Sequence, residues 1–279
     1  MCIKNSPFPC GKCPVCKENH RLRWVLRNRL EYLVSKSAYF LTLTYDEEHI
    51  ENNELNKTDA QKFLKRIRKR LSLKDKELSL RYMLVGEYGT TTGRRHYHAL
   101  FYFNKYLPPL ETEKLVKLSW TLGHSVTKPL NERMTGYVCK YHLKLCPLPF
   151  EGAQKPFMLS SRRPALGISY LLQNEQYLRS TPELRKLTIE GKTYYLNSYL
   201  LSKIYDDEER KYFTSAEDIK NSIDIRNTIS LKINRRPFDY YNQTDAELAE
   251  YKRLTLARTD YSKFRAKRLM KNHNKPQTF

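Results

Sequence analysis

Apolar positions along the chain switch between helical and strand-like spacing, which predicts a mixed α/β fold of the α+β type. Apolar residues at intervals of three and four predict helices at 21–35, 58–71, 111–122 and 131–145. Short runs rich in aromatic and β-branched residues predict strands at 38–45, 80–88, 95–103 and 124–128. The resulting βαββαβ order is that of a ferredoxin-like fold. We therefore expect an antiparallel sheet with helices on one face and its other face free for a site or for nucleic acid.

The pattern divides the chain into three parts. A Cys-rich segment covers residues 1–28, the βαββαβ core covers 29–149, and a mixed or mainly helical extension covers 150–279. Within the extension, local signals predict a hairpin at 187–196 and helices at 216–222 and 245–257. The last stretch, 251–279, holds nine Lys or Arg and one acid, which is typical of a basic tail.

Charge narrows the choice of partner. The chain has 51 Lys and Arg against 30 Asp and Glu, a formal net charge of +21, and such an excess favours nucleic acid. No apolar run is long enough for a membrane helix, and the start, MCIKNSPFPC, lacks the apolar core of a signal peptide. We therefore expect no membrane span and no secretion, and expect the six cysteines to be reduced thiols or metal ligands.

Two histidines in the strand predicted at 95–103 form a candidate metal site. Side chains two residues apart on a strand point to the same face about 6.8 Å apart, so His96 and His98 can bind one ion. If the hairpin closes symmetrically over residues 89–94, Glu87 lies opposite His96 and points to the same side. The pattern predicts a two-His, one-carboxylate site with open positions for a phosphate oxygen. A one-residue slip would turn Glu87 away, and two surface histidines on an edge strand are the alternative.

Two tyrosines follow on the helix predicted at 131–145. Tyr137 and Tyr141 are four residues apart and share one helical face, so both hydroxyls can address one site. This spacing alone indicates only packing, but Lys140 and Lys144 accompany the pair. A nearby cation favours ionisation of a phenol and helps to neutralise a phosphate.

Four cysteines near the start of the chain offer a second candidate metal site. Three of them have the spacing C-x2-C-x2-C and one lies upstream: Cys2, Cys10, Cys13 and Cys16. Four thiolates can bind a structural Zn²⁺, although the spacing differs from that of two separated knuckles, and free thiols are the alternative. Cys139 and Cys146 are isolated, and we expect them to be packed.

The helix predicted at 58–71 carries basic side chains opposite its apolar line. Such a row is either a solvated face or a contact surface for the DNA backbone. The residues expected to contact DNA are Lys62, Arg66, Lys69 and Arg70, together with Lys140.

The motifs together resemble those of the rolling-circle replication initiators of small single-stranded DNA phages, the microviruses, and in particular their gokushovirus branch. The matching stretches are CGKCPVCK, FLTLTYD, VGEYG, RRHYHALF, YVCKYHLK and PFMLSSRRPALGISYL, which occur in the family's order between Cys10 and Leu171. HYH corresponds to the HUH metal motif of these endonucleases, and YVCKYHLK to their paired tyrosines. Arg95 and Pro164–Gly167 stand where the family often has a Pro and a Pro-Gly-Ile-Gly run.

The resemblance implies an HUH endonuclease that nicks and rejoins single-stranded DNA at a viral origin. His96, His98 and Glu87 would hold Mg²⁺ or Mn²⁺, and Tyr137 or Tyr141 would form a 5′-phosphotyrosine with support from Lys144. The implied partners are the single-stranded origin and a host DNA polymerase and helicase, in the host bacterial cytoplasm.

Three other functions fit parts of the pattern. An RRM-like, non-enzymatic binding module would use Tyr97, Phe101 and Phe103 as a stacking platform on the open sheet face, but it leaves the two histidines unexplained. A zinc-ribbon regulator would rest on the N-terminal cysteines. A relaxase or transposase of the same HUH type is a third alternative; the order of the motifs argues against a relaxase, and a transposase would more often carry a single tyrosine.

Overall fold

The structure is a computed structural model, and its description covers most of the first 210 residues. The described residues are 10–50, 53–89, 93–141, 148–180, 186–189, 191–207 and 210, with isolated positions between 244 and 253. The chain forms two compact units, one comprising Arg21–Leu178 and the other comprising Met1–His20 with Arg179–Phe279. The predicted division at residues 28 and 149 stays an interpretation, and the site described below lies within the first unit.

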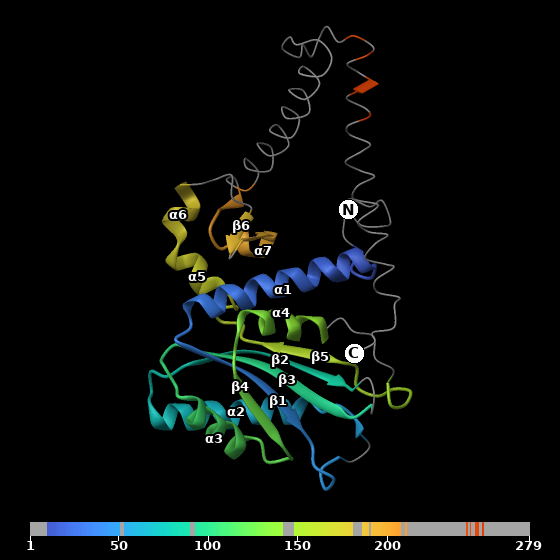
Figure 1. The fold of residues 1–279 in the computed structure, drawn as a ribbon, viewed down its shortest axis with the longest axis vertical. Helices are drawn as coiled ribbons and strands as arrows, with labels where there is room; N and C mark the ends of the chain where they lie inside the picture. Colours follow the sequence, from blue (N-terminus) through green and yellow to red (C-terminus); the bar gives the residue numbers. More distant parts are fainter. Residues whose placement is uncertain are drawn as a thin grey trace. The chain divides into compact units, whose positions relative to one another are not determined.

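The centre of the Arg21–Leu178 unit is a five-stranded antiparallel sheet (Figure 1). The strands are β1 (Ser37–Thr44), β2 (Leu80–Tyr88), β3 (Arg95–Phe103), β4 (Ser125–Pro129) and β5 (Phe157–Ser160). Their spatial order is β4-β1-β3-β2-β5, so the first four strands have the predicted ferredoxin-like arrangement. The sequence pattern did not predict β5, a short edge strand that pairs with β2.

Helices cover both faces of this sheet. Helices α2 (Lys57–Lys74) and α3 (Pro109–Ser119) lie on one face, and α1 (Pro14–Val34) and α4 (Glu132–Tyr141) lie across the other (Figure 1). On the second face Asn28 of α1 donates a hydrogen bond from Nδ2 to Met83 Sδ at 2.9 Å and accepts one from the Tyr102 hydroxyl at 3.0 Å. The expectation that this face is free is therefore wrong for much of its area, because α1 and α4 pack on it.

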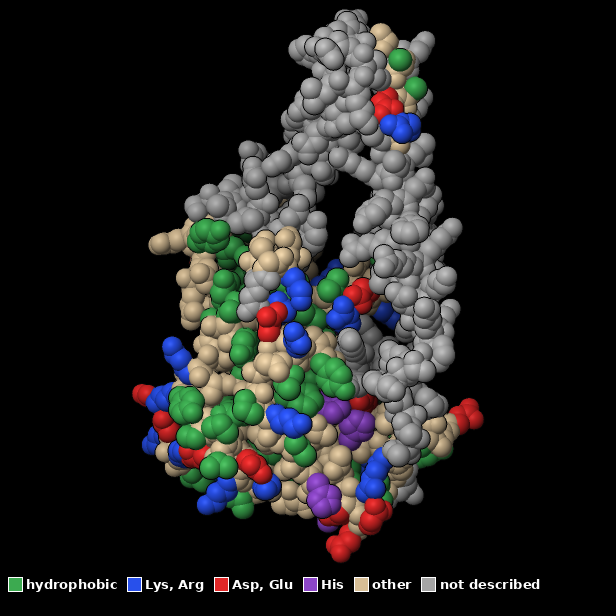
Figure 2. All heavy atoms as spheres, in the orientation of Figure 1, with side chains coloured by type: hydrophobic (Ala, Val, Ile, Leu, Met, Phe, Trp, Pro, Cys, Tyr) green, Lys and Arg blue, Asp and Glu red, His purple; other side chains and the backbone are tan. Residues whose placement is uncertain are grey.

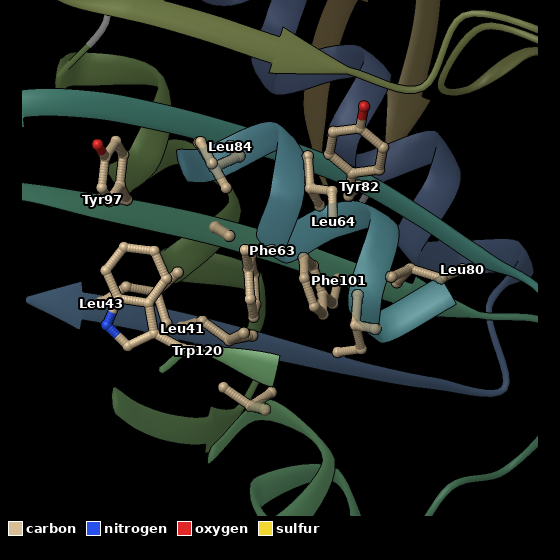
Figure 3. Close-up of a cluster of buried hydrophobic side chains, with 14 of the residues drawn as sticks. Leu41, Leu43, Phe63, Leu64, Leu80, Tyr82, Leu84, Tyr97, Phe101 and Trp120 are labelled. Carbon is tan, nitrogen blue, oxygen red and sulfur yellow. The ribbon is translucent and has the colours of Figure 1, made fainter. Parts of the chain in front are cut away.

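The main hydrophobic core lies between the sheet and the pair α2 and α3. Phe63 of α2 stacks on Phe101 of β3, with ring centroids 6.0 Å apart, and Trp120 packs edge-on to Phe63 (Figure 3). Tyr97, Phe101 and Phe103 all point into this core and are at most 1% exposed. The stacking platform of the RRM-like alternative is therefore wrong, since these rings cannot reach a base.

The start of α2 shows which cap the sequence uses. The helix begins at Lys57, and Asn56 Oδ1 accepts hydrogen bonds from the backbone N–H groups of Thr58 at 2.9 Å and Asp59 at 3.2 Å. An Asn at this position satisfies N–H groups that have no partner within the helix. The helix start predicted at residue 58 is thus one residue too late, and Asn56 rather than Thr58 is the cap.

Gly123 permits a close approach of two chain segments. Helix α3 ends at Ser119, so the predicted helix end at residue 122 is wrong. Gly123 has a φ of +145°, and a Cβ there would lie 2.3 Å from the backbone nitrogen of Asp46 and 2.5 Å from the carbonyl oxygen of Thr44. The absence of a side chain lets β4 begin beside the end of β1.

Replacing Gly123 with alanine is expected to destabilise the fold strongly. The backbone atoms that the new Cβ would meet cannot rotate away, so we expect the free energy of unfolding to fall by more than about 3 kcal/mol in urea denaturation. Gly93→Ala is the matched control, because Gly93 also has a positive φ, +66°, but has no atom within 4 Å of an added Cβ. That variant should lose only about 1 kcal/mol, and equal losses in the two variants would contradict the steric account.

The second unit contains a small hairpin. Strands β6 (Lys186–Ile189) and β7 (Lys192–Tyr195) pair as predicted, and a short helix α7 (Ser198–Leu201) follows. Two further short helices precede it along the chain, α5 (Ile168–Gln173) and α6 (Glu175–Ser180). The helix predicted at 216–222 lies outside the described residues, as does all but a few positions of 245–279. Among the described helices, none combines the length and apolar character needed to cross a membrane.

Candidate active site

The hairpin of β2 and β3 brings the predicted metal ligands together. Glu87 pairs with His96 in the predicted register, and His98 pairs with Val85 on one side and Thr42 on the other. Because neighbouring paired positions on a sheet point the same way, all three predicted ligands lie on the face opposite the main core. The symmetric closure of the hairpin, and with it the position of Glu87, is confirmed.

The three side chains form a compact cluster with the donor set of a divalent cation site. Glu87 Oε1 lies 2.9 Å from His96 Nε2 and 3.5 Å from His98 Nε2, and one ligand atom from each residue falls within 4.8 Å of the others. The side chains of His96 and His98 keep 17% and 11% of their surface exposed. Figure 2 shows histidine side chains reaching the surface next to hydrophobic and acidic ones.

A buried oxygen supports the fit of a cation at this cluster. Glu87 is 3% exposed, and within the described part of the chain its Oε2 has no hydrogen-bond partner. A buried carboxylate oxygen without a partner is costly unless a cation or a water satisfies it. Imidazole and carboxylate together fit a divalent ion such as Mn²⁺ or Mg²⁺, and the residues present therefore suit the ion that the sequence motifs imply.

The electrostatic state of Glu87 also suits a cation. Burial is the largest single influence and raises the pKa of Glu87, but the hydrogen bonds and positive charge of His96 and His98 together outweigh it and lower the pKa below its ordinary value. The carboxylate is accordingly ionised near neutral pH, which is the form that binds a metal ion.

Two neighbours that the sequence analysis missed orient the histidine rings. His96 Nδ1 lies 3.0 Å from the backbone carbonyl oxygen of Arg94, and His98 Nδ1 lies 3.1 Å from Thr42 Oγ1. A ring nitrogen facing a carbonyl must carry the proton, which leaves Nε2 of His96 as the ligand atom. Thr42 holds His98 with its Nε2 toward Glu87 in the same way. Thr42 belongs to the stretch FLTLTYD, so only the pairing of β1 with β3 reveals this contact.

Thr42→Val is expected to weaken metal binding without disturbing the fold. Valine has nearly the same shape but cannot hydrogen-bond to His98 Nδ1, so the ring loses its orienting partner. Loss of such an outer contact typically costs about 10–100-fold in metal affinity, which calorimetric titration of the DNA-free protein with Mn²⁺ would measure. Thr42→Ser keeps the hydroxyl and should retain most of the affinity. Equal affinities for the valine and serine variants would show that Thr42 does not position His98.

Helix α4 carries the predicted tyrosines to the edge of this cluster. Tyr137 is 42% exposed, and its ring centroid lies 6.4 Å from that of His98. Phe40 of β1 lies against both, stacked on His98 at 5.4 Å and edge-on to Tyr137 at 6.2 Å. Tyr141 is the last residue of α4, one helical turn beyond Tyr137. The side chains of Tyr141 and Lys140, and all of Lys144, lie outside what the structure describes.

Buried contacts hold α4 in place on the sheet. The guanidinium of Arg29 in α1 forms an ion pair with Glu132 in the first turn of α4. Cys139 donates a hydrogen bond to the Thr135 carbonyl at 3.3 Å and accepts one from Asn28 Nδ2 at 3.5 Å. Cys139 is 1% exposed, and burial raises the pKa of its thiol to about 12. The expectation that Cys139 is a packed residue is confirmed.

The basic residues of α2 lie across the sheet from the cluster. Lys62, Lys69 and Arg70 are exposed, whereas Arg66 is partly buried. Arg66 Nη1 donates to the Ser119 carbonyl at 3.2 Å and Arg70 Nη2 to the Leu118 carbonyl at 3.1 Å, so both side chains bind the C-terminal end of α3. Their expected contact with DNA stays a prediction, and any such contact lies on the face of the sheet opposite the histidines.

The N-terminal cysteines form a separate group in the other unit. Cys10, Cys13 and Cys16 place their sulfur atoms within 4.8 Å of one another, while Cys2 lies outside the described residues. The structure thus brings together three of the four predicted thiolates.

Both departures from the family pattern have structural reasons. Arg95 stacks its guanidinium over Tyr45 at 3.8 Å and donates a 2.5 Å hydrogen bond to the His49 carbonyl, which secures the loop after β1. In the Pro164–Gly167 segment, Gly167 has a φ of +82° and its N–H donates to Glu31 Oε2 at 2.7 Å. Neither departure involves the metal cluster or the tyrosines.

Comparisons with known proteins agree with this site. Residues 38–145 match the family model of the phage replication-associated protein ORF2, a range that includes Glu87, both histidines and both tyrosines. The chain is 30% identical over 156 residues to replication-associated protein VP4 of Bdellovibrio phage phiMH2K, covering 51% of this chain and 50% of that protein. It is 28% identical over 193 residues to replication-associated protein ORF2 of Spiroplasma virus 4, covering 62% of this chain and 60% of that protein.

A third relative extends the similarity. Replication-associated protein ORF4 of Chlamydia phage 1 is 24% identical over 229 residues, covering 73% of this chain and 56% of that protein. The matched part therefore spans about half to three-fifths of the length of these curated relatives. No solved structure matches the chain. The resemblance inferred from the motifs is nevertheless confirmed, and through residues 38–145 the chain belongs to the ORF2 family of phage replication-associated proteins.

Proposed function

We propose that this protein initiates rolling-circle replication of a small circular single-stranded DNA phage genome by nicking and rejoining one DNA strand at the origin. The observation that carries the proposal is the cluster of Glu87, His96 and His98 with the exposed Tyr137 beside it. Cation ligands and a phenol next to one another on an accessible surface suit covalent attack on a phosphodiester.

In the proposed reaction Tyr137 acts first. Its phenolic oxygen attacks the scissile phosphorus, the bond from phosphorus to the 3′ oxygen breaks, and the 3′ oxygen leaves as a hydroxyl after taking up a proton. The phenol loses its own proton, and the product is a 5′-phosphotyrosine. A divalent ion held by His96, His98 and Glu87 would polarise the scissile phosphate and stabilise the charge that builds up on it. The new ester conserves the free energy of the phosphodiester, so rejoining needs no ATP.

Tyr141 is proposed to act in the second half of the cycle. After one round of synthesis it cleaves the regenerated origin in the same way, and the freed 3′-hydroxyl attacks the phosphotyrosine at residue 137. This attack restores a phosphodiester and closes a circle. Helical spacing of four residues places both tyrosines over one site. Lys144 would support the phosphate or the leaving group, and Lys140 would contact the DNA backbone.

The wider function follows from the same chemistry. The released 3′-hydroxyl can prime a host DNA polymerase, and a host helicase would separate the strands, so the reaction belongs in the host bacterial cytoplasm. A net charge of +21 supplies affinity for DNA of any sequence, and this affinity should fall steeply with salt.

The experiment that tests the proposal uses the full chain and single-stranded fragments of the phage genome that encodes it, with Mn²⁺ or Mg²⁺. A denaturing gel should show a DNA band covalently attached to protein, and mass spectrometry should locate the phosphotyrosine at Tyr137 or Tyr141. Binding without any covalent band, across all fragments and both ions, would refute the nickase and favour a binding protein.

A further inference from the structure

The three cysteines before and within the start of α1 have a geometry that free thiols do not require. Cys10 Sγ lies 3.9 Å from Cys16 Sγ, and Cys13 Sγ completes a group whose members all fall within 4.8 Å. A disulfide would need a sulfur separation of about 2.05 Å. Tetrahedral zinc with Zn–S bonds of about 2.3 Å separates its sulfur ligands by about 3.8 Å, close to the distance found.

The backbone around the group favours thiolates. The N–H of Cys13 donates a hydrogen bond to Cys10 Sγ at 3.4 Å, and such a bond stabilises the charged form of the sulfur. Gly11, between these two cysteines, has a φ of +70°, which a residue with a side chain adopts only under strain. This tight turn brings Cys10 and Cys13 together, and the start of α1 at Pro14 then presents Cys16 to them.

We propose that Cys10, Cys13 and Cys16 hold a structural Zn²⁺, a site separate from the histidine cluster. The ion would fix the turn of 10–13 against the first turn of α1, tying together a segment too short to bury a core of its own. The remaining tetrahedral position takes a further ligand, for which the upstream Cys2 supplies one thiolate in the sequence. Zinc rather than Mg²⁺ or Mn²⁺ is the expected metal, because thiolates select soft ions.

The test is metal analysis of the full chain purified without chelator. We expect elemental mass spectrometry to find one zinc per chain at this site, and to find it lost in Cys13→Ser. Cys146→Ser is the control, since it also removes one thiol but lies outside the C-x2-C-x2-C spacing, and it should retain the zinc. Replacement of the zinc by Co²⁺ should give sulfur-to-metal charge-transfer absorption and the visible bands of tetrahedral Co²⁺.

These readouts keep the two metal sites distinguishable. The His96→Ala/His98→Ala variant should retain the zinc and the thiolate absorption of Co²⁺, because the histidine cluster has no sulfur ligand. The Co²⁺ spectrum of the unmodified chain also remains informative if Cys13→Ser fails to fold. Absence of zinc and of thiolate–Co²⁺ bands in the unmodified chain, or iron with sulfide in place of zinc, would overturn the proposal whatever the result of the nicking assay.

Discussion

The double variant His96→Ala/His98→Ala is expected to lose DNA cleavage by at least about 10³-fold while keeping most of its affinity for single-stranded DNA. The two imidazoles supply two of the three cation ligands, and alanine leaves Glu87 alone, a buried carboxylate at 3% exposure. A 10³-fold loss corresponds to about 4 kcal/mol of transition-state stabilisation, a reasonable magnitude for removing a metal ion from phosphate chemistry. Binding should persist, since it depends chiefly on the basic charge of the whole chain.

The measurement combines a denaturing gel for cleavage with fluorescence anisotropy for binding, at one salt concentration. His124→Ala is the matched control, because His124 is exposed and lies on the neighbouring chain segment beside Thr44 rather than in the cluster. It should cleave at the normal rate. A double variant that cleaves like the unmodified protein would remove the histidines from the reaction, and one that no longer binds DNA would indicate a structural contribution instead.

The second large effect concerns the nucleophiles. Tyr137→Phe removes only the hydroxyl, so Phe40 and His98 keep an aromatic neighbour, yet the first covalent step should fall by at least about 10³-fold. Tyr141→Phe should still form the first adduct but should fail to release closed circles. The double variant should form no covalent adduct. A gel for the adduct and an exonuclease-resistance assay for circles separate these outcomes.

The control for the tyrosines is Tyr106→Phe. Tyr106 is 69% exposed and lies four residues after Tyr102, so this pair repeats the sequence spacing of the proposed nucleophiles. The two members of that pair differ, however, because Tyr102 is 1% exposed and donates to Asn28. Tyr106→Phe should behave like the unmodified chain. Covalent adduct in the double variant Tyr137→Phe/Tyr141→Phe would place the nucleophile elsewhere.

The metal ligands were predictable because they depend on local rules. Strand residues two apart share a face, and a tight hairpin fixes which residues oppose one another, so His96, His98 and Glu87 could be grouped from spacing alone. The same rules predicted the bounds of β2 and β3 without error. Helix ends were less well predicted, as at Asn56 and Ser119, because caps depend on single hydrogen bonds and on what packs nearby.

Other parts of the site depend on contacts between residues far apart in the sequence. Nothing in the spacing of Thr42 or Phe40 indicates that they touch His98, because the pairing of β1 with β3 decides it. The same holds for the covering of the second sheet face by α1 and α4, which depends on the contacts of Asn28.

The sequence by itself therefore determined the α+β class, the βαββαβ order, the metal ligands and the paired tyrosines, since each follows from a repeat of two or of about four residues. Only the tertiary structure decided that Tyr137 lies beside His98, that Tyr97, Phe101 and Phe103 are core residues, and that Arg66 and Arg70 bind α3. The physical reason is that periodicity states which side chains share a face. What that face meets depends on the packing of elements distant in the chain.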